Sequence, residues 1–308
     1  MRGPVRSAPY LPVVNATALC ISLGRRDEAL SLELRGDDGH FTLTLDAGGE
    51  LAVELSGQRR CIGHRPPGSG TLVACPNQRT GTSSNQCPDC FAASMMLPCL
   101  RCEGDRCQNP KRRVACVQPD NHAVYLAAFA PGVYKVGVAR WERRRERLVE
   151  QGARAAVIVG RDDGQQARRV EAQIKRLVDD EGNQLIPDKR TFHEKLTLLT
   201  VAGDRPQLED ELRRVWPLIR PRLRGRFLDE IETVDLPEAP LLDCPPRVVS
   251  AHADLRVRGV IEAVCGQTLL IDSDSGERVA LDAGGLVGYA LRPLAADEVG
   301  VGQLVLAV

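Results

Sequence analysis

The sequence predicts an α+β protein in which a cysteine-rich block and a mixed α/β core lie between two β-rich ends. Three observations support this class: apolar and polar residues alternate at both ends, eight of the eleven cysteines fall in one short stretch, and strand-like and helix-like patterns alternate in the centre. With 308 residues, 43% of them hydrophobic, the chain is long enough for two or three domains. The predicted parts are a β-rich N-terminal segment at 1–58, a cysteine-rich module at 59–118, a mixed α/β domain at 119–235 and a β-rich C-terminal domain at 236–308.

The β-rich ends are marked by period-two alternation. Residues 15–55 include the runs Ser31-Leu-Glu-Leu-Arg35 and Phe41-Thr-Leu-Thr-Leu45, with Gly and Asp turns between strands, as expected of a small antiparallel sheet. Strand-like runs near the C-terminus begin at Gly259, Thr268, Arg278 and Val287. Each end is short for an independent core, so we expect the two ends to pack on each other as one discontinuous β domain.

The cysteine-rich module contains few aliphatic residues, so hydrophobic burial alone does not account for its folding. Its two C-x-x-C pairs, Cys87 with Cys90 and Cys99 with Cys102, can each bring two thiolates to one tetrahedral ion at about 2.3 Å. The count predicts two structural Zn²⁺ sites, each contributing on the order of 10 kcal/mol to folding. The predicted ligands are Cys61, Cys75, Cys87, Cys90, Cys99, Cys102, Cys107 and Cys116.

The sequence does not decide which cysteines bind the same ion. One division assigns the first four cysteines to one ion and the last four to the other, but an interleaved pairing fits equally well, and His64 or His122 can replace a cysteine. Closed four-ligand coordination argues against catalysis by zinc. The cysteines outside the module, Cys20, Cys244 and Cys265, are expected to be small buried apolar residues.

A disulfide framework is the competing interpretation of the module. It requires an oxidising compartment and normally a secretory leader. The first ten residues are interrupted by prolines, and the apolar residues after them are too few and too mixed for a leader or a membrane span. We therefore expect a cytoplasmic protein without membrane contact, and we favour zinc over an iron–sulfur cluster or a redox thiol pair.

The net charge of zero hides a basic region. Residues 101–170 hold 15 Lys or Arg against 8 Asp or Glu, and such a surplus is typical of a surface that binds a polyanion. The expected partner is nucleic acid, with DNA favoured over RNA, and the sequence does not say whether a protein partner exists. The aromatic content of 4% argues against base stacking on single strands as the main binding mode.

The centre of the chain predicts strand, turn, strand, helix, strand, helix. The strands are expected at 123–129, 133–139 and 155–160, the first helix at 142–151, and the second helix from Asp162 or Asp163. Glu171 lies within the apolar stripe of the second helix, where an ionised carboxylate needs a partner. That partner is either Lys175 at the favourable i, i+4 spacing, or a metal ion or an arginine from another element.

Ala123-Val-Tyr125, the run Lys135-Val-Gly137 after nine further residues, an Arg-rich first helix and Glu171 on the second helix together resemble the GIY-YIG nuclease superfamily. The resemblance covers about sixty residues. The whole chain, with its cysteine block before the hairpin, also resembles an uncharacterised family related to that superfamily. The implied fold is a GIY-YIG-like mixed α/β core preceded by a zinc module and flanked by β-rich segments.

The resemblance implies catalytic residues and an activity. Tyr125 matches the first tyrosine and Gly137 the second motif's glycine, whereas Glu171 matches the carboxylate that holds Mg²⁺ or Mn²⁺ in a phosphodiester cleft. Arg145 and Arg147 both match the helix arginine, with a slight preference for Arg147. Lys135 stands where the superfamily usually has its second tyrosine, so either Lys135 helps to deprotonate water or the ion alone does so.

The implied function is that of a divalent-metal-dependent endonuclease. In this mechanism Tyr125 orients or deprotonates the water, and an arginine neutralises the developing charge. The basic residues Arg101, Arg106, Lys111, Arg112 and Arg113 would then grip the nucleic-acid backbone. Two alternatives use the same surface: a non-catalytic DNA- or RNA-binding module, and an enzyme that acts on a small or tRNA-borne substrate.

Overall fold

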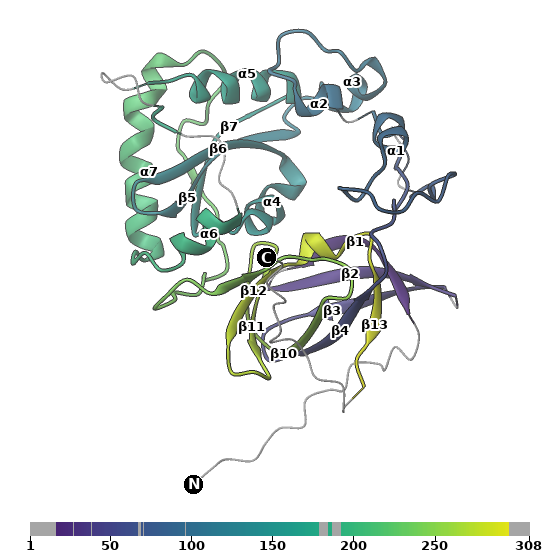
Figure 1. The fold of residues 1–308 in the computed structure, drawn as a ribbon. Coiled ribbons are helices and arrows are strands. Elements are labelled where there is room, and N and C mark those ends of the chain that lie inside the picture. Colours follow the sequence, from purple (N-terminus) through teal and green to yellow (C-terminus); the bar gives the residue numbers. More distant parts are fainter. Residues whose placement is uncertain are drawn as a thin grey trace. The chain divides into compact units, whose positions relative to one another are not determined.

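The structure is a computed structural model that describes residues 17–26, 28–37, 39–66, 69, 71–95, 97–178, 184–186 and 192–295. The chain forms two compact units. The first unit comprises residues 1–63, 74–87 and 246–308, and the second comprises residues 64–73 and 88–245. Within the described residues there are two named sheets and seven α-helices (Figure 1). This content agrees with the predicted α+β class.

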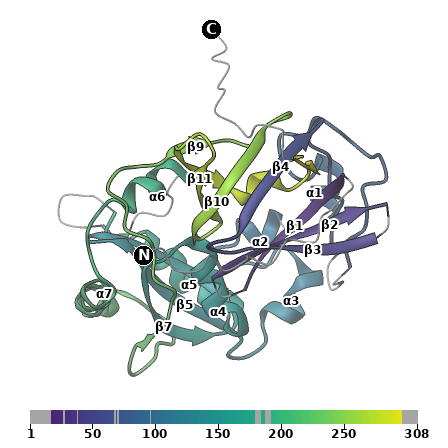
Figure 2. The same ribbon diagram turned by 90° about the horizontal axis from the view of Figure 1, so that it is seen from below.

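The first unit is built on a nine-stranded sheet in the order β3-β2-β1-β13-β4-β10-β11-β12-β9. Strands β1, β2 and β3 run side by side in both views (Figures 1 and 2). Neighbouring strands are antiparallel except for β12 and β9. The strands are β1 Ala18–Arg26, β2 Ala29–Gly36, β3 Gly39–Leu45, β4 Glu50–Ser56, β9 Arg247–Val249, β10 Arg256–Cys265, β11 Thr268–Ser273, β12 Arg278–Asp282 and β13 Ala290–Pro293.

Both ends of the chain contribute strands to this sheet. Strand β13 lies between β1 and β4, and β4 pairs on its other side with β10. Because successive side chains of a strand point to opposite faces, Leu30, Leu32 and Leu34 of β2 are buried while the residues between them are partly exposed. These leucines share one core with Leu51 of β4 and Ile261 of β10. Two segments too short to bury a core alone thus bury one together.

The second unit contains a four-stranded antiparallel sheet in the order β6-β5-β7-β8. Its strands are β5 His122–Ala130, β6 Val133–Arg140, β7 Ala155–Asp162 and β8 Glu232–Thr233. Its helices are α1 Pro88–Ala93, α2 Leu97–Leu100, α3 Pro110–Cys116, α4 Arg144–Gln151, α5 Gly164–Lys175, α6 Phe192–Leu198 and α7 Arg205–Ile219. Short 3₁₀ turns occupy Trp141–Arg143, Arg220–Arg222 and, in the first unit, Ala283–Leu286.

Helices cover both faces of this second sheet. Val124 and Leu126 of β5 pack in a cluster with residues of α5 and α7, whereas Tyr125 and Ala127 pack on the opposite face with Leu148 of α4. Because both faces of β5 are buried after its first residue, its sequence from Ala123 onward is continuously apolar instead of alternating. Figure 1 shows α4 and α5 on opposite sides of the strands.

Both predicted ends of the first central helix and the predicted start of the second are confirmed to within two residues. Helix α4 ends at Gln151 and is followed by Gly152 in the left-handed conformation, with φ of 73°. Helix α5 is capped by Asp163, whose carboxylate accepts hydrogen bonds from the backbone N–H groups of Gln165 and Gln166. Among the described residues, no helix combines the length and the apolar composition needed to cross a membrane.

Candidate functional site

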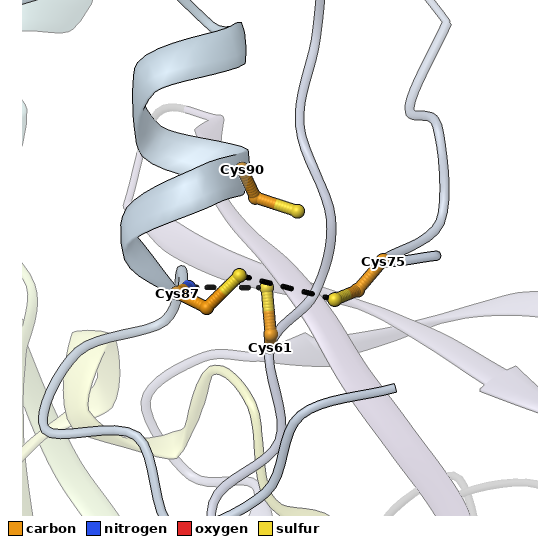
Figure 3. A group of neighbouring side chains, drawn as sticks. All are labelled: Cys61, Cys75, Cys87 and Cys90. Carbon is orange, nitrogen blue, oxygen red and sulfur yellow. Dashed lines mark hydrogen bonds between the residues drawn. The ribbon is translucent and has the colours of Figure 1, made fainter. Parts of the chain in front are cut away.

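Four of the predicted ligand cysteines converge on one point. The Sγ atoms of Cys61, Cys75, Cys87 and Cys90 all lie within 4.8 Å of one another, and all four residues are buried (Figure 3). The Sγ atoms of Cys75 and Cys87 are 3.9 Å apart, close to the edge of about 3.8 Å of a tetrahedron with metal–sulfur bonds of about 2.3 Å. All eleven cysteines of the chain are free thiols in this structure. The group is therefore compatible with a structural metal such as zinc.

Backbone N–H groups are directed at the sulfur of Cys61. The N–H of Gly63 donates to it at 3.4 Å, and the N–H of Cys87 donates at 3.1 Å. Such donors stabilise the charge of a thiolate, which is the form that binds metal. The donor set and its surroundings thus fit a four-thiolate zinc site. Neither His64 nor His122 belongs to this group.

The remaining four cysteines of the module lie close together in a looser group within the second unit. Burial, followed by the charges of Cys102, Cys107 and Cys99, raises the pKa of the Cys116 thiol above its usual value. The side-chain amide of Asn109, which is buried, donates to Cys99 Sγ at 3.4 Å. This neighbourhood supports the division into two groups of four over the interleaved pairing.

The same local turn occurs in both cysteine groups. Gly104 follows Cys102 as Gly63 follows Cys61, and in each case the glycine N–H donates to the cysteine sulfur at 3.4 Å. Both glycines have positive φ, 96° for Gly63 and 87° for Gly104, which other residues adopt only with strain. The Cys-x-Gly spacing is a signal in the sequence that could have linked the two groups before the structure was known.

The expectation that Cys20, Cys244 and Cys265 are all buried is confirmed for Cys20 alone. Cys20 is fully buried, and burial raises the pKa of its thiol to about 12, as expected of a small apolar residue. Cys244 is exposed and Cys265 is only partly buried. Cys244 lies in a proline-rich segment outside the helices and strands, so no sheet or helix face covers it.

Tyr125 and Gly137 are directly paired across strands β5 and β6. The tyrosine ring lies over the glycine, because a Cβ atom added at position 137 would come within 2.2 Å of the Tyr125 hydroxyl oxygen. Lys135 pairs with Ala127 two positions along the same strands, so Lys135 and Gly137 share a face of β6. The absence of a side chain at Gly137 leaves room for the phenol at the edge of the sheet.

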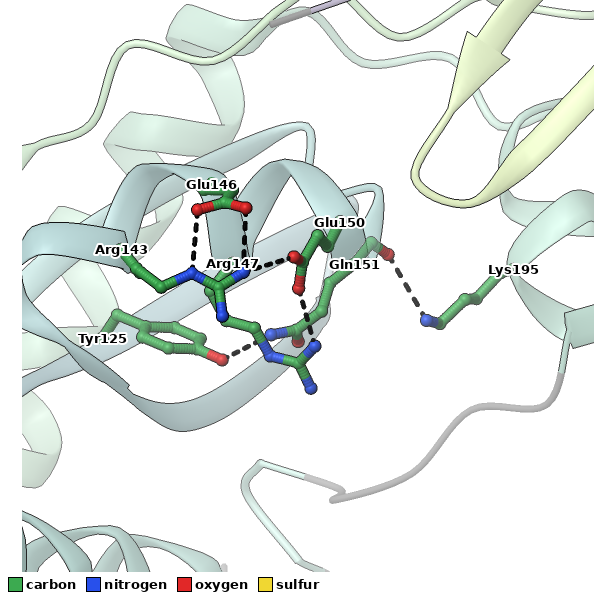
Figure 4. Close-up of polar contacts among 7 residues, drawn as sticks. All are labelled: Tyr125, Arg143, Glu146, Arg147, Glu150, Gln151 and Lys195. Atoms are coloured by element: carbon green, nitrogen blue, oxygen red, sulfur yellow. Dashed lines mark hydrogen bonds and ion pairs between the residues drawn. The ribbon is translucent and has the colours of Figure 1, made fainter. Parts of the chain in front are cut away.

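The Tyr125 hydroxyl is held from helix α4. Gln151 Nε2 donates to it at 2.5 Å, and both residues are buried (Figure 4). On the same helix, the Arg147 guanidinium forms an ion pair with Glu150 at 2.9 Å and remains half exposed. Arg145 is directed elsewhere, since its Nε donates to the backbone oxygen of Asp235 at 2.9 Å. Of the two candidate arginines, Arg147 is therefore the one near the tyrosine.

Glu171 is buried within helix α5 and already has cationic partners. Its carboxylate accepts from Arg168 Nη1 at 2.8 Å and from Lys175 Nζ at 3.1 Å. The predicted i, i+4 pair with Lys175 is thus present, and Arg168 at i, i+3 completes the neutralisation. This arrangement explains how a carboxylate can lie in the apolar stripe of the helix.

The charges of three side chains act on the Tyr125 hydroxyl. Burial raises its pKa above the usual value, the Gln151 hydrogen bond and the charges of Arg147 and Arg168 lower it, and the Glu171 carboxylate raises it. The phenol is therefore neutral near pH 7, and the charges of a guanidinium on α4 and of a carboxylate on α5 both affect its pKa. The pKa of the nearby His122 imidazole is shifted in the opposite direction from that of Tyr125: burial and the charges of Arg140 and Arg168 lower it to about 4.

Gln151 and Arg168 were missed by the sequence analysis as members of this site. Gln151 is the last residue of α4, next to Gly152, and Arg168 lies one turn before Glu171.

The basic residues predicted to bind a polyanion lie on the loop and helix around the second cysteine group. Arg101, Arg106, Lys111 and Arg113 are exposed, whereas Arg112 is partly buried and donates to the backbone oxygen of Ser94 at 3.2 Å.

No match to the chain was found among curated proteins or among solved structures. One family model matches residues 48–291 of the chain. This range includes all eight cysteines of the module and every candidate residue around Tyr125. The matching family model is described as "Protein of unknown function (DUF2797)".

Proposed function

The chain belongs to the DUF2797 family, whose description names no function, and from its candidate site we propose that it is a zinc-stabilised nucleic-acid-processing protein. The proposed site binds one phosphodiester beside Tyr125, Arg147 and Glu171. The specific activity we propose is that of a divalent-metal-dependent endonuclease of GIY-YIG type, acting on DNA in preference to RNA.

The observation that carries the proposal is the set of groups around the Tyr125 hydroxyl. The Tyr125 phenol of β5 lies over Gly137 of β6, and both a guanidinium from α4 and a carboxylate from α5 affect the pKa of its hydroxyl. A phosphodiester needs a cation for its charge and donors for its oxygens, whereas a divalent ion needs a carboxylate. Strand β5 and the two helices are separate in sequence, so their convergence is not a consequence of helix or strand periodicity.

The proposed chemistry is an in-line hydrolysis. The oxygen of a water molecule forms a bond to phosphorus while the ester bond to the leaving oxygen breaks; the water loses a proton and the leaving oxygen gains one. Arg147 neutralises the charge that develops on the phosphoryl oxygens. Lys135, on the face of β6 that carries Gly137, is the candidate to accept the proton in its neutral form. Mg²⁺ or Mn²⁺ at Glu171 would supply Lewis acidity and lower the pKa of a bound water.

The cysteine groups have a structural role in this proposal. Two zinc ions would fold the segment that presents the exposed cations Arg101, Arg106, Lys111 and Arg113. Contacts of these side chains with phosphates position a nucleic acid without reading its sequence. We therefore propose a substrate chosen by backbone shape and not by base sequence.

A cleavage assay tests the proposed activity. Purified protein with Mg²⁺ or Mn²⁺ is incubated with plasmid, single-stranded and branched DNA and with RNA. We expect Glu171→Gln and Arg147→Ala each to lower the cleavage rate by about 100-fold or more, because each removes a group that stabilises the transition state. The matched controls are Glu146→Gln and Arg145→Ala on α4, which should change the rate only a few-fold. Cleavage that persists in Glu171→Gln would rule out this mechanism.

A second candidate function is favoured by the ion pairs of Glu171. Since Arg168 and Lys175 already neutralise this carboxylate, the same surface can serve as a non-catalytic nucleic-acid-binding site in which no divalent ion takes part. In that case the protein binds DNA or RNA with a steep salt dependence, nothing is cleaved, and Glu171→Gln leaves the affinity unchanged or increases it. Binding titrations at two salt concentrations, run beside the cleavage assay, separate the two functions.

A further inference from the structure

Gln151 has one side-chain atom with a partner and one without. Its Nε2 donates to the Tyr125 hydroxyl at 2.5 Å, whereas its Oε1 is buried and has no hydrogen-bond partner in the part of the chain that the structure describes. The residue is only 7% exposed, and a buried acceptor without a partner costs about 1–3 kcal/mol. Such an atom beside a candidate site points to a water or a ligand that completes it.

The direction of the Gln151 hydrogen bond decides what the tyrosine can do. An amide N–H can only donate, so the Tyr125 oxygen is the acceptor and its own proton remains free to be donated. The hydroxyl lies over Gly137, which has no side chain that could accept that proton. The charged groups that act on the hydroxyl are Arg147 on α4 and Arg168 and Glu171 on α5. Lys135 lies on the face of β6 that carries Gly137.

We propose that Gln151 is a positioning residue that holds the Tyr125 hydroxyl as a hydrogen-bond donor to an anionic oxygen of the ligand. Its Oε1 then accepts a hydrogen bond from a water bound next to that oxygen. Tyr125 would thus orient the phosphate and would not remove a proton from water. The identity of the ligand as a phosphodiester rests on the proposed function, whereas the polarity of the Gln151–Tyr125 pair does not.

The polarity can be measured without any substrate. The chain contains four tyrosines, so labelling with 3-fluorotyrosine gives few ¹⁹F resonances, and Tyr125→Phe identifies the one of interest. A donor to the phenol oxygen stabilises the phenolate, so we expect Gln151→Met to raise the pKa of Tyr125. If Gln151 instead accepted the tyrosine proton, the same change would lower that pKa, and the proposal would be overturned. Gln151→Leu replaces the Met variant if the latter does not fold.

A double-mutant cycle tests the link to the ligand. The probe is a short fluorescein-labelled DNA duplex in buffer without added Mg²⁺ or Mn²⁺. Gln151→Met should weaken binding about fivefold, the equivalent of one hydrogen bond of about 1 kcal/mol, and should have a clearly smaller effect when Tyr125 is already phenylalanine. An equal loss in both backgrounds overturns the proposal. If the unaltered protein does not bind DNA, the proposed function fails, and the ¹⁹F titration still decides the polarity of the pair.

Discussion

Replacing Gly137 with alanine tests whether the Tyr125 ring fills the space over that residue. The added Cβ would lie 2.2 Å from the hydroxyl oxygen, 2.4 Å from Cζ and 2.9 Å from Cε2 of the tyrosine. Favourable contacts between such atoms begin at about 3.5 Å. The ring must therefore move by about 1 Å to restore contact distance, but Tyr125 is only 2% exposed and is tied to Gln151.

The expected loss of stability follows from these contacts. Overpacking of a buried site costs about 1–3 kcal/mol, and displacement of the hydroxyl from Gln151 adds about 1 kcal/mol. We therefore expect Gly137→Ala to lower the free energy of unfolding of the second unit by about 2–4 kcal/mol. Both tryptophans of the chain, Trp141 and Trp216, belong to this unit, so denaturant unfolding followed by tryptophan fluorescence reports on it selectively.

A second background separates the ring contact from other effects of the added methyl group. In Tyr125→Leu the phenol is absent, so Gly137→Ala should cost less than about 1 kcal/mol there. Two results would refute the reasoning: a loss below about 0.5 kcal/mol in the unaltered background, or the same loss in both backgrounds.

Three further predictions concern the cysteine groups and helix α7. If both cysteine groups bind zinc as proposed, Cys61→Ser and Cys99→Ser should each lower the bound zinc from two ions per chain to one, whereas replacement of the exposed Cys244 by serine should leave it unchanged. Metal analysis that finds two ions in both variants would contradict the two-site proposal. Gly104→Ala should destabilise the second unit by about 2 kcal/mol or more. The backbone of Gly104 has a φ of 87°, and a Cβ atom there would lie 2.3 Å from the backbone oxygen of Gln165. An unfolding curve, followed by tryptophan fluorescence, that does not change would contradict this prediction. Tyr134 donates to Glu211 at 2.9 Å, and burial together with that carboxylate raises its pKa to about 12. The neutral phenol therefore stabilises the fold fully below about pH 10, and this contribution is lost as the pH rises towards 12. Tyr134→Phe should cost about 1 kcal/mol near neutral pH, and the difference should shrink above pH 10 in denaturant titrations.

The order of elements in the second unit could be predicted from the sequence because each element carries a local signal. Asp163 and Gly152 mark a helix start and a helix end, and the turn at 131–132 joins two apolar runs. The place of β13 between β1 and β4 could not be predicted, since strand pairing over more than two hundred residues leaves no local pattern. The exposure of Cys244 was missed for a similar reason, because composition alone does not say which segments are covered.

The candidate site could be predicted in part. The motif resemblance predicted Tyr125 and Glu171 but left Arg145 and Arg147 as alternatives. Two residues apart on a helix are about 200° apart around its axis, so only one of these arginines can face the tyrosine. Gln151 was missed because its role depends on a hydrogen bond to a strand residue 26 positions away, which neither periodicity nor spacing encodes.

Helix α5 links the second cysteine group to the candidate site. Arg169 Nε donates to the backbone oxygen of Gly104 at 2.8 Å, and Gln165 Nε2 donates to that of Asp105 at 3.0 Å. The loop that makes these contacts lies between Cys102 and Cys107, so an ion bound by both would fix its shape. Glu171 is on the same helix, two residues beyond Arg169. Loss of an ion bound there should therefore disturb the groups around Tyr125 even though no cysteine takes part in the proposed chemistry.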